Sequence, residues 1–213
     1  MKYIIEHSCD TKEVGYVSWG QTELTNPYSA DELLDKGKKI KTISVRMHKR
    51  AKLTDILSCF KLGISNNFII SERMRNVLEG FKIQPHLFID CNVEKKDGEI
   101  IKYNVLHFKG NQFLEMVDFK KSVFKISWSY TWPLDGTEPI IEINNYSDFV
   151  QKEKELDSQH LCIRLDKYVM KEDCKKYDMY TFRPLNTGNF ISKELRDVIV
   201  DNNLTGLKII EVD

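Results

Sequence analysis

The sequence lacks a long apolar run, an excess of charge of either sign, and any linker rich in proline and glycine. No apolar segment approaches the ~20 residues that cross a bilayer, and no signal-peptide core follows the first residues, Met1 to His7. The 32 basic residues are balanced by 32 acidic residues, whereas chains devoted to nucleic acid carry a clear basic excess. These absences predict a cytoplasmic protein with no membrane partner, and they argue against nucleic acid as a partner.

The five cysteines form no metal-binding or redox pattern. Their number is odd and no two have the C-x-x-C spacing: Cys9, Cys59, Cys91, Cys162 and Cys174. This usage predicts reduced thiols, several of them buried as small hydrophobic side chains.

Sequence motifs for catalysis are missing as well. The chain has no G-x-G-x-x-G, no phosphate-binding loop and no G-x-S-x-G, and its five histidines lie far apart. His107, inside a strand pattern, is more typical of a hydrogen-bonded strand histidine than of a ligand. We therefore predict no catalytic residue, no metal and no cofactor. A small enzyme, a hydrolase or transferase with a dispersed site, stays open because catalytic groups need meet only in space.

What the sequence does contain predicts an α+β fold of mostly antiparallel, twisted sheets with a few short helices packed on them. Hydrophobic residues make up 41% of the chain, enough for a substantial core. Alternation and strand-forming residues predict twelve strands: 3–7, 14–19, 40–47, 68–70, 83–90, 100–108, 113–117, 122–128, 139–143, 161–165, 179–183 and 207–212. Asp97-Gly98 between two of them predicts a hairpin.

Helices are predicted from capping residues and three-and-four apolar spacing. One follows Ser29 and ends at Gly37, a short turn follows Lys52, and a third follows Ser71 and stops at Gly80. A fourth spans 147–156 and buries Phe149, Val150 and Leu156, while its charged residues Glu153, Glu155 and Asp157 face solvent. Because no linker separates domains, we predict one continuous structure. Residues 1–51 form an N-terminal strand and helix region, and residues 52–213 form the domain that follows it.

One pattern occurs twice, at residues 68–78 and 189–199, with a constant offset of 121 residues between Ser71 and Ser192. Each copy reads as strand, serine N-cap, amphipathic helix and second strand, the last at 83–90 and 207–212. Either serine could serve as a nucleophile only with a histidine or acid partner, and the sequence identifies none. Helix capping is therefore the preferred role.

Two segments leave an interaction surface open. Trp128, Tyr130 and Trp132 alternate, so on a strand they share one face. That face is either the protein's own core, which is the usual case, or an anchor for a protein partner. Basic residues also gather in one stretch, where a solvated face is the preferred reading over a nucleic-acid patch: Lys36, Lys38, Lys39, Lys41, Arg46, Lys49, Arg50 and Lys52.

Three segments carry a resemblance through their order and spacing: FIISERMRNVL at 68–78, YNVLHF at 103–108 with VDFKKS at 117–122, and FISKEL at 190–195 with LTGL at 204–207. Together they resemble a family of bacterial immunity proteins, which are encoded beside polymorphic toxins. The resemblance covers about residues 52–213, and the first fifty residues match nothing in it.

The resemblance implies a non-enzymatic antitoxin whose partner is a cognate protein toxin, bound in the cytoplasm of the producing bacterial cell. The family pattern supplies scaffold residues, Ser71, Asp118, Ser122 and Ser192, but no contact residues. It does not imply which toxin activity is blocked. Many immunity proteins are acidic because they cover basic nuclease clefts, and this neutral chain departs from them.

Overall fold

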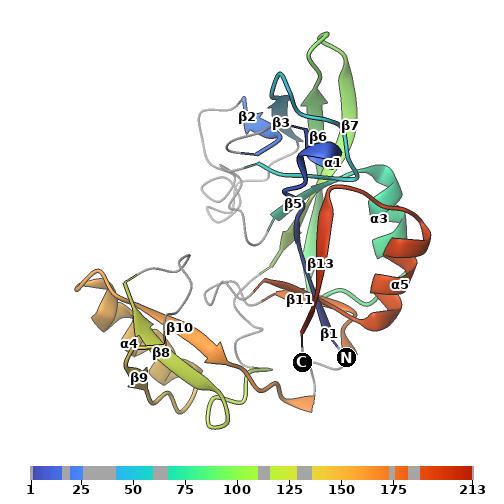
Figure 1. Ribbon diagram of the computed structural model, residues 1–213. Helices are drawn as coiled ribbons and strands as arrows, with labels where there is room; N and C mark the ends of the chain where they lie inside the picture. The colour runs from blue at the N-terminus through green and yellow to red at the C-terminus, as the bar shows by residue number, and fades with distance from the viewer. Residues whose placement is uncertain are drawn as a thin grey trace. The chain divides into compact units, whose positions relative to one another are not determined.

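The structure, a computed structural model, is an α+β protein whose sheets are mostly antiparallel (Figure 1). It describes residues 2–15, 20–25, 42–59, 67–109, 116–128, 136–172, 176–181 and 188–212. The chain forms two compact units. Unit 1 comprises Met1–Lys109, Tyr177–Tyr180 and Gly188–Asp213, and unit 2 comprises Gly110–Lys176 and Thr181–Thr187. No helix among the described residues is both long and apolar enough to cross a membrane.

Unit 1 contains two sheets. A six-stranded sheet has the order β2-β3-β6-β7-β5-β4, and a four-stranded sheet has the order β11-β12-β1-β13. The elements are β1 (Lys2–His7), α1 (Thr11–Val14), β2 (Thr22–Leu24), β3 (Thr42–Met47), β4 (Ile56–Leu57), β5 (Asn67–Ile70), α3 (Glu72–Glu79), β6 (His86–Glu94), β7 (Ile100–Phe108), β11 (Met179–Thr181), β12 (Asn189–Ile191), α5 (Lys193–Asp201) and β13 (Leu207–Val212).

The two edges of the six-stranded sheet are hydrogen-bonded to each other: residues at the start of β2 bond to a residue just after β4. The backbone N–H groups of Gln21 and Thr22 both donate to the Ser58 carbonyl at 3.0 Å. The buried Gln21 side chain donates to the Lys52 carbonyl and the Thr54 hydroxyl at 2.8 and 2.9 Å. These bonds satisfy edge groups that would otherwise stay unpaired. The sheet thereby surrounds one apolar cluster: Leu24, Ile43, Val45, Met47, Ala51, Leu57, Cys59, Ile69, Ile89, Cys91, Val93, Tyr103 and Val105.

The repeated pattern folds into two equivalent substructures. In the first, β5 pairs with β7 and β7 with β6, and α3 connects β5 to β6. In the second, β12 pairs with β1 and β1 with β13, and α5 connects β12 to β13. The register is the same, because Phe68 and Phe88 flank Leu106 as Asn189 and Ile209 flank Ile5. The central strand of the second copy comes from the start of the chain, so the two copies are circularly permuted.

Both helices begin at a serine with the same geometry. Ser71 has φ −65° and ψ 164°, and Ser192 has φ −70° and ψ 164°. Each hydroxyl accepts a hydrogen bond from a backbone N–H three residues on, at 3.2 Å in both copies. This satisfies one of the N–H groups that a helix start leaves without a partner. The sequence prediction of two Ser-capped strand–helix–strand units is confirmed.

The helices lie side by side and share one core (Figure 1). Met74 and Leu78 of α3, and Leu195 and Ile199 of α5, are each at most 1% exposed. These four occupy equivalent positions in the two copies. The helical periodicity that predicted them therefore marks the face buried against the sheets.

The described residues of unit 2 form a three-stranded sheet in the order β10-β8-β9 and one helix. Its elements are β8 (Val123–Ser127), β9 (Ile140–Ile141), α4 (Tyr146–Asp157) and β10 (Cys162–Lys167). Phe119, Phe124 and Phe149 form its aromatic core, with ring centroids 5.6 to 6.4 Å apart. As predicted, α4 buries Phe149 and Leu156, whereas Val150, also expected on the buried side, is half-buried.

Two predicted elements are wrong where the structure describes them. Val14, expected in a strand, ends the short helix α1, which Asp10 caps by accepting from the Lys12 N–H at 2.9 Å. The helical turn expected after Lys52 is instead extended chain leading into β4, which pairs with β5 inside the core. Both errors concern segments of two to four residues, where tertiary pairing decides the conformation. The helix expected after Ser29 lies outside the described residues. So do residues 113–115 of the strand expected at 113–117, and its described residues Met116 and Val117 belong to no strand, although Val117 forms an isolated bridge with Met170.

Candidate protein-binding surface

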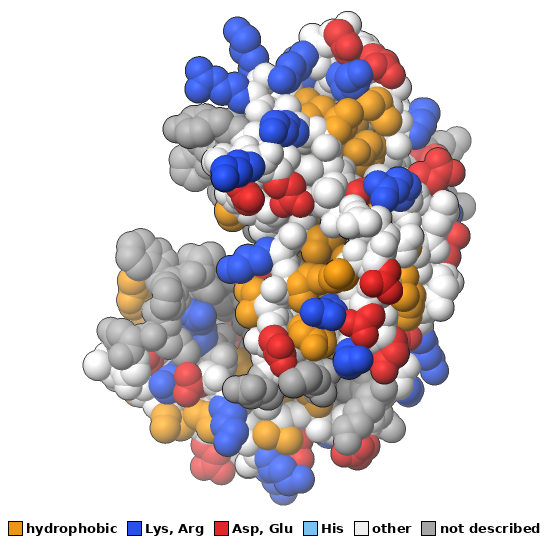
Figure 2. All heavy atoms as spheres, turned by 45° about the vertical axis from the view of Figure 1, so that its right-hand side comes forward, with side chains coloured by type: hydrophobic (Ala, Val, Ile, Leu, Met, Phe, Trp, Pro, Cys, Tyr) orange, Lys and Arg blue, Asp and Glu red, His pale blue; other side chains and the backbone are white. Residues whose placement is uncertain are grey.

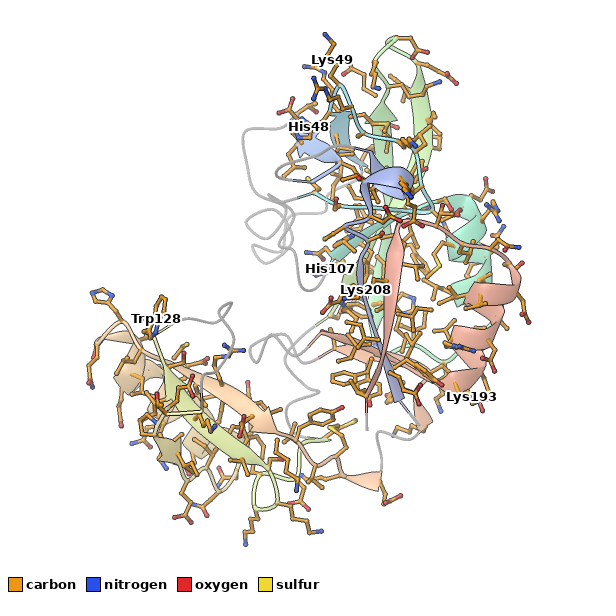
Figure 3. The ribbon with its side chains drawn as sticks, in the orientation of Figure 1. His48, Lys49, His107, Trp128, Lys193 and Lys208 are labelled. Carbon is orange, nitrogen blue, oxygen red and sulfur yellow. The ribbon has the colours of Figure 1, made fainter. Side chains whose placement is uncertain are left out.

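Trp128 follows the end of β8 in unit 2 and has 67% of its surface exposed. Phe124, Ile126 and Trp128 alternate along this segment and so project to one face. Phe124 is 1% exposed against the aromatic core, and Ile126 is half-buried. The face therefore runs from the core to the surface, and Figure 3 shows Trp128 at the outer end of the strand. Trp128 is not part of the protein's own core, which was the usual reading of this segment.

The other two aromatic residues of the segment, Tyr130 and Trp132, lie outside the described residues. A second exposed apolar side chain, Ile140 of β9, is 72% exposed. Ile140 pairs with Lys125, which projects to the face opposite Phe124 and Trp128. Trp128 and Ile140 therefore belong to different faces of the sheet.

Asp118 and Ser122, the scaffold residues that the resemblance implies in unit 2, hold one turn. The Ser122 N–H donates to the Asp118 carbonyl at 3.0 Å, and the Asp118 carboxylate pairs with Lys121 at 3.1 Å. Two bonds dock the turn on the chain after β10: the Asp118 N–H donates to the Val169 carbonyl at 2.8 Å, and the Val169 N–H donates to the Ser122 hydroxyl at 2.9 Å. Their observed role is structural.

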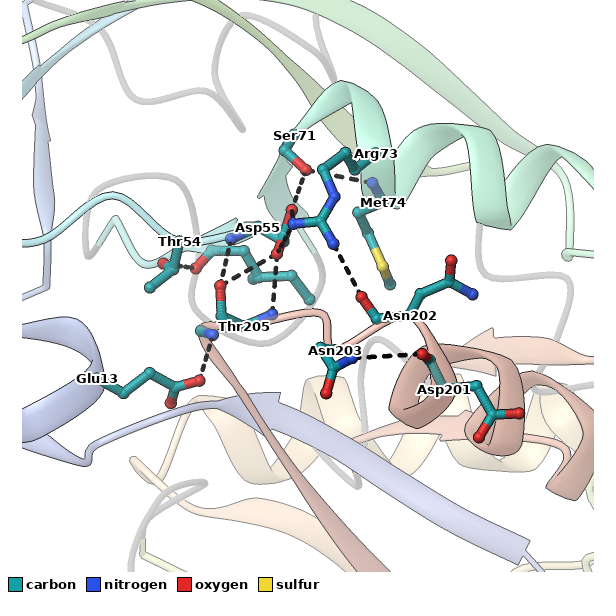
Figure 4. Close-up of polar contacts among 12 residues, drawn as sticks. Glu13, Thr54, Asp55, Ser71, Arg73, Met74, Asp201, Asn202, Asn203 and Thr205 are labelled. Carbon is teal, nitrogen blue, oxygen red and sulfur yellow. Dashed lines mark hydrogen bonds and ion pairs between the residues drawn. The ribbon is translucent and has the colours of Figure 1, made fainter.

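A carboxylate that the sequence did not single out, Asp55, connects three segments of unit 1 (Figure 4). Asp55 is 5% exposed. It accepts from the Ser71 hydroxyl at 2.7 Å and from the Thr205 N–H and hydroxyl at 3.0 and 3.1 Å. Arg73 pairs with it at 3.3 Å and also donates to the Asn202 carbonyl. Asp55 thus joins β4, the start of α3 and the loop after α5.

Asp178 has the corresponding place in the second copy. The Ser71 and Ser192 N–H groups donate to the carbonyls of Asp55 and Asp178, both at 2.8 Å. The Asp178 carboxylate accepts from the Lys82 N–H at 2.9 Å, in the loop after α3. Each copy therefore holds the loop that follows the helix of the other copy. This exchange ties the two copies together through hydrogen bonds.

Two hollows occur among the described residues, one in each unit. The hollow in unit 1 has a volume of about 550 Å³ and the one in unit 2 about 430 Å³. In the first, Arg75 donates to Glu79 at 2.8 Å and to Asn104 at 2.9 Å, so these groups are already satisfied inside the protein. Within the described part of the chain, no three His, Cys, Asp or Glu side chains are grouped to hold a metal ion.

Burial shifts three titratable groups of unit 1 toward their neutral forms. It lowers the pKa of His7 from 6.5 to about 4, and raises that of Cys91 to about 12, where Cys59 adds a smaller effect. The pKa of Tyr103 also rises to about 12, mainly through burial and then through the charge of Asp55. A thiol with so high a pKa is not a nucleophile at neutral pH. His107 bonds to the Asn67 side chain at 2.8 Å, as a strand histidine does.

No protein-family model matches the chain, and no curated protein is similar to it in sequence. The structure defines an α+β protein of two units. One unit contains a duplicated scaffold whose copies are joined by hydrogen bonds, and the other has an exposed tryptophan beside a small sheet.

Proposed function

We propose that the chain is a non-enzymatic immunity protein, which binds and neutralises a cognate bacterial toxin in the cytoplasm of the producing cell. The resemblance over residues 52–213 suggests this function, and the exposure of Trp128 is the observation that supports it. A tryptophan exposed to solvent leaves a large apolar area in water, and such residues are enriched at binding hot spots. Its rigid ring buries this area at a low cost in side-chain entropy when a partner covers it.

The proposal is tested with the purified chain and the toxin domain encoded beside its gene. Trp128→Ala should weaken binding by ~2 kcal/mol, about thirtyfold in Kd, measured by calorimetry. The midpoint of thermal unfolding should not change, because an exposed side chain contributes little to stability.

Ile140→Ala is the matched control, since it removes an equally exposed apolar side chain from the opposite face of the sheet. Its affinity should equal that of the unchanged chain. If the unchanged chain neither binds the toxin nor protects cells that express it, the immunity function is rejected. If Trp128→Ala binds normally, Trp128 lies outside the interface.

A further inference from the structure

Unit 1 carries a group of basic side chains where α1 meets the turn between β3 and β4. We define this basic patch as Lys12, Lys49, Arg50 and Lys52, all of which are exposed. Figure 3 shows Lys49 projecting outward beside His48, and Figure 2 shows basic side chains gathered at the same end of the molecule. From the sequence, the basic residues between positions 36 and 52 were predicted to form a solvated face, and Lys12 was not included among them.

The backbone brings these charges together in a fixed arrangement. The Lys52 N–H donates to the Val14 carbonyl at 2.9 Å, and its ammonium donates to the Lys12 carbonyl at 2.7 Å. Gly15 makes this approach possible, because a Cβ there would lie 2.1 Å from the Arg50 carbonyl oxygen. Gly15 also has φ +84°, which side-chain-bearing residues rarely adopt. The backbone positions that carry these charges, and the Lys52 ammonium, are therefore held in place before any partner arrives.

Charge in the patch is only partly neutralised by the protein. Lys12, Lys49 and Lys52 form no ion pair with any carboxylate among the described residues, whereas neighbouring Arg46 pairs with Glu94 at 3.1 Å. Two acidic residues flank Lys12, and each carboxylate bonds to a backbone N–H: Asp10 accepts from the Lys12 N–H, and Glu13 from the Gly206 N–H at 2.8 Å (Figure 4). Both stay charged, but the four cations of the patch outnumber them. A chain with no net charge thus presents a locally positive surface.

We propose that the basic patch is an electrostatic docking surface for an acidic face of the partner protein. This inference rests on the proposed function and names the chemistry of the partner. A strand of nucleic acid is a poorer fit. Sites that follow a phosphate backbone combine a basic groove with stacking aromatic side chains, whereas the four residues of this patch, all in the described part of the chain, lie around a tight turn and include no aromatic side chain. Complementary charges mainly raise the association rate.

The test compares two double variants with the same change in net charge. Lys12→Glu with Lys49→Glu reverses two of the four charges, which neutralises the patch, and keeps the Lys52 hydrogen bond. Lys96→Glu with Lys208→Glu reverses two exposed lysines that also lack ion pairs among the described residues but lie elsewhere in unit 1. With the toxin domain encoded beside the gene, the patch variant should associate about tenfold more slowly at low salt. The control should differ from the unchanged chain by less than about twofold.

The outcomes separate the two proposals. If the unchanged chain binds the toxin and both variants associate equally fast, the docking surface is rejected while the immunity function stands. If the unchanged chain does not bind the toxin, the immunity function fails and the docking inference fails with it. If a fluorescent 20-nucleotide single strand binds the unchanged chain and the patch variant loses that binding, the patch is a nucleic-acid surface and the inference is wrong.

Discussion

At the scale of single residues, Asp55 connects distant segments of unit 1, although no local sequence pattern marks it as a structural residue. Its carboxylate is buried and accepts several hydrogen bonds from two distant segments. Asp55→Asn keeps the shape but replaces one acceptor oxygen with a donor. We expect a loss of ~2–4 kcal/mol in the free energy of unfolding, since a buried N–H or hydroxyl loses its acceptor. Urea denaturation would measure it.

Arg73→Gln serves as the comparison. It removes the ion pair with Asp55 but leaves the other donors in place, and the Arg73 side chain is 63% exposed. Solvent screens such a pair, so the expected loss is under about 1 kcal/mol. Equal losses in the two variants would show that the ion pair, and not the buried acceptor, stabilises the junction.

The sequence could predict Ser71 and Ser192 but not Asp55, and the difference is one of distance along the chain. An N-cap acts on a backbone N–H three residues away, so its signal is local. Asp55 and Thr205 are separated by 150 residues, and nothing in the spacing of either indicates the other. The exposure of Trp128 could not be predicted from the sequence either. Alternation shows that residues share one face of a strand, but it does not show which part of that face other elements bury.

At the scale of elements, the two helices offer a test of equivalence. Leu78 and Ile199 are 0% and 1% exposed at corresponding positions of α3 and α5. Leu78→Ala and Ile199→Ala should each cost ~2–5 kcal/mol of stability, because each leaves a cavity in the shared core. The two costs should agree within about 1 kcal/mol in chemical denaturation.

Glu79 and Val200, the next residues in each helix, supply the matched control. Both are about half exposed, so Glu79→Ala and Val200→Ala should change stability by less than about 0.5 kcal/mol. A small effect of Leu78→Ala beside a large effect of Ile199→Ala would mean that only one copy carries the core.

Long elements were predictable and short ones were not. The hairpin of β6 and β7 turns at Asp97-Gly98, where Gly98 has φ +85°, and this follows from local residue types. The strand expected at 83–90 is shifted to 86–94, partly because its later residues pair with β3 in parallel. Parallel strands are joined by long connections, so no turn residue between them indicates from the sequence that they pair.

At the scale of the whole molecule, each unit has its own core, so conditions that weaken one need not weaken the other. His7 packs against Phe68 in unit 1 with a ring-centroid distance of 5.1 Å, and its Nδ1 is buried with no hydrogen-bond partner. Its pKa is lowered to about 4 in the folded protein. The unfolded chain therefore binds a proton first as pH falls below about 6.5, and stability decreases from there down to pH 4.

Between pH 7 and pH 5 we expect unit 1 to lose ~1–2 kcal/mol through His7, because the unfolded chain binds a proton there and the buried imidazole does not. Hydrogen exchange measured by mass spectrometry would show faster exchange in β1 and β12 than in α4 at the lower pH. His7→Gln should remove this difference, since glutamine does not titrate. A pH dependence that survives in His7→Gln would assign it to another group.

The pairing of β1 with β13 has a consequence for biosynthesis. Lys2 lies opposite Val212, so β1 must wait until a segment made about 210 residues later has left the ribosome. Until then, the central strand of the second copy lacks its neighbours. Its apolar residues Tyr3 and Ile5 must meanwhile be covered by chaperones or by non-native contacts, since exposed apolar surface promotes aggregation. Such distant pairing also slows folding. The first copy, whose strands and helix all lie between residues 56 and 108, can assemble while the rest of the chain is still being made.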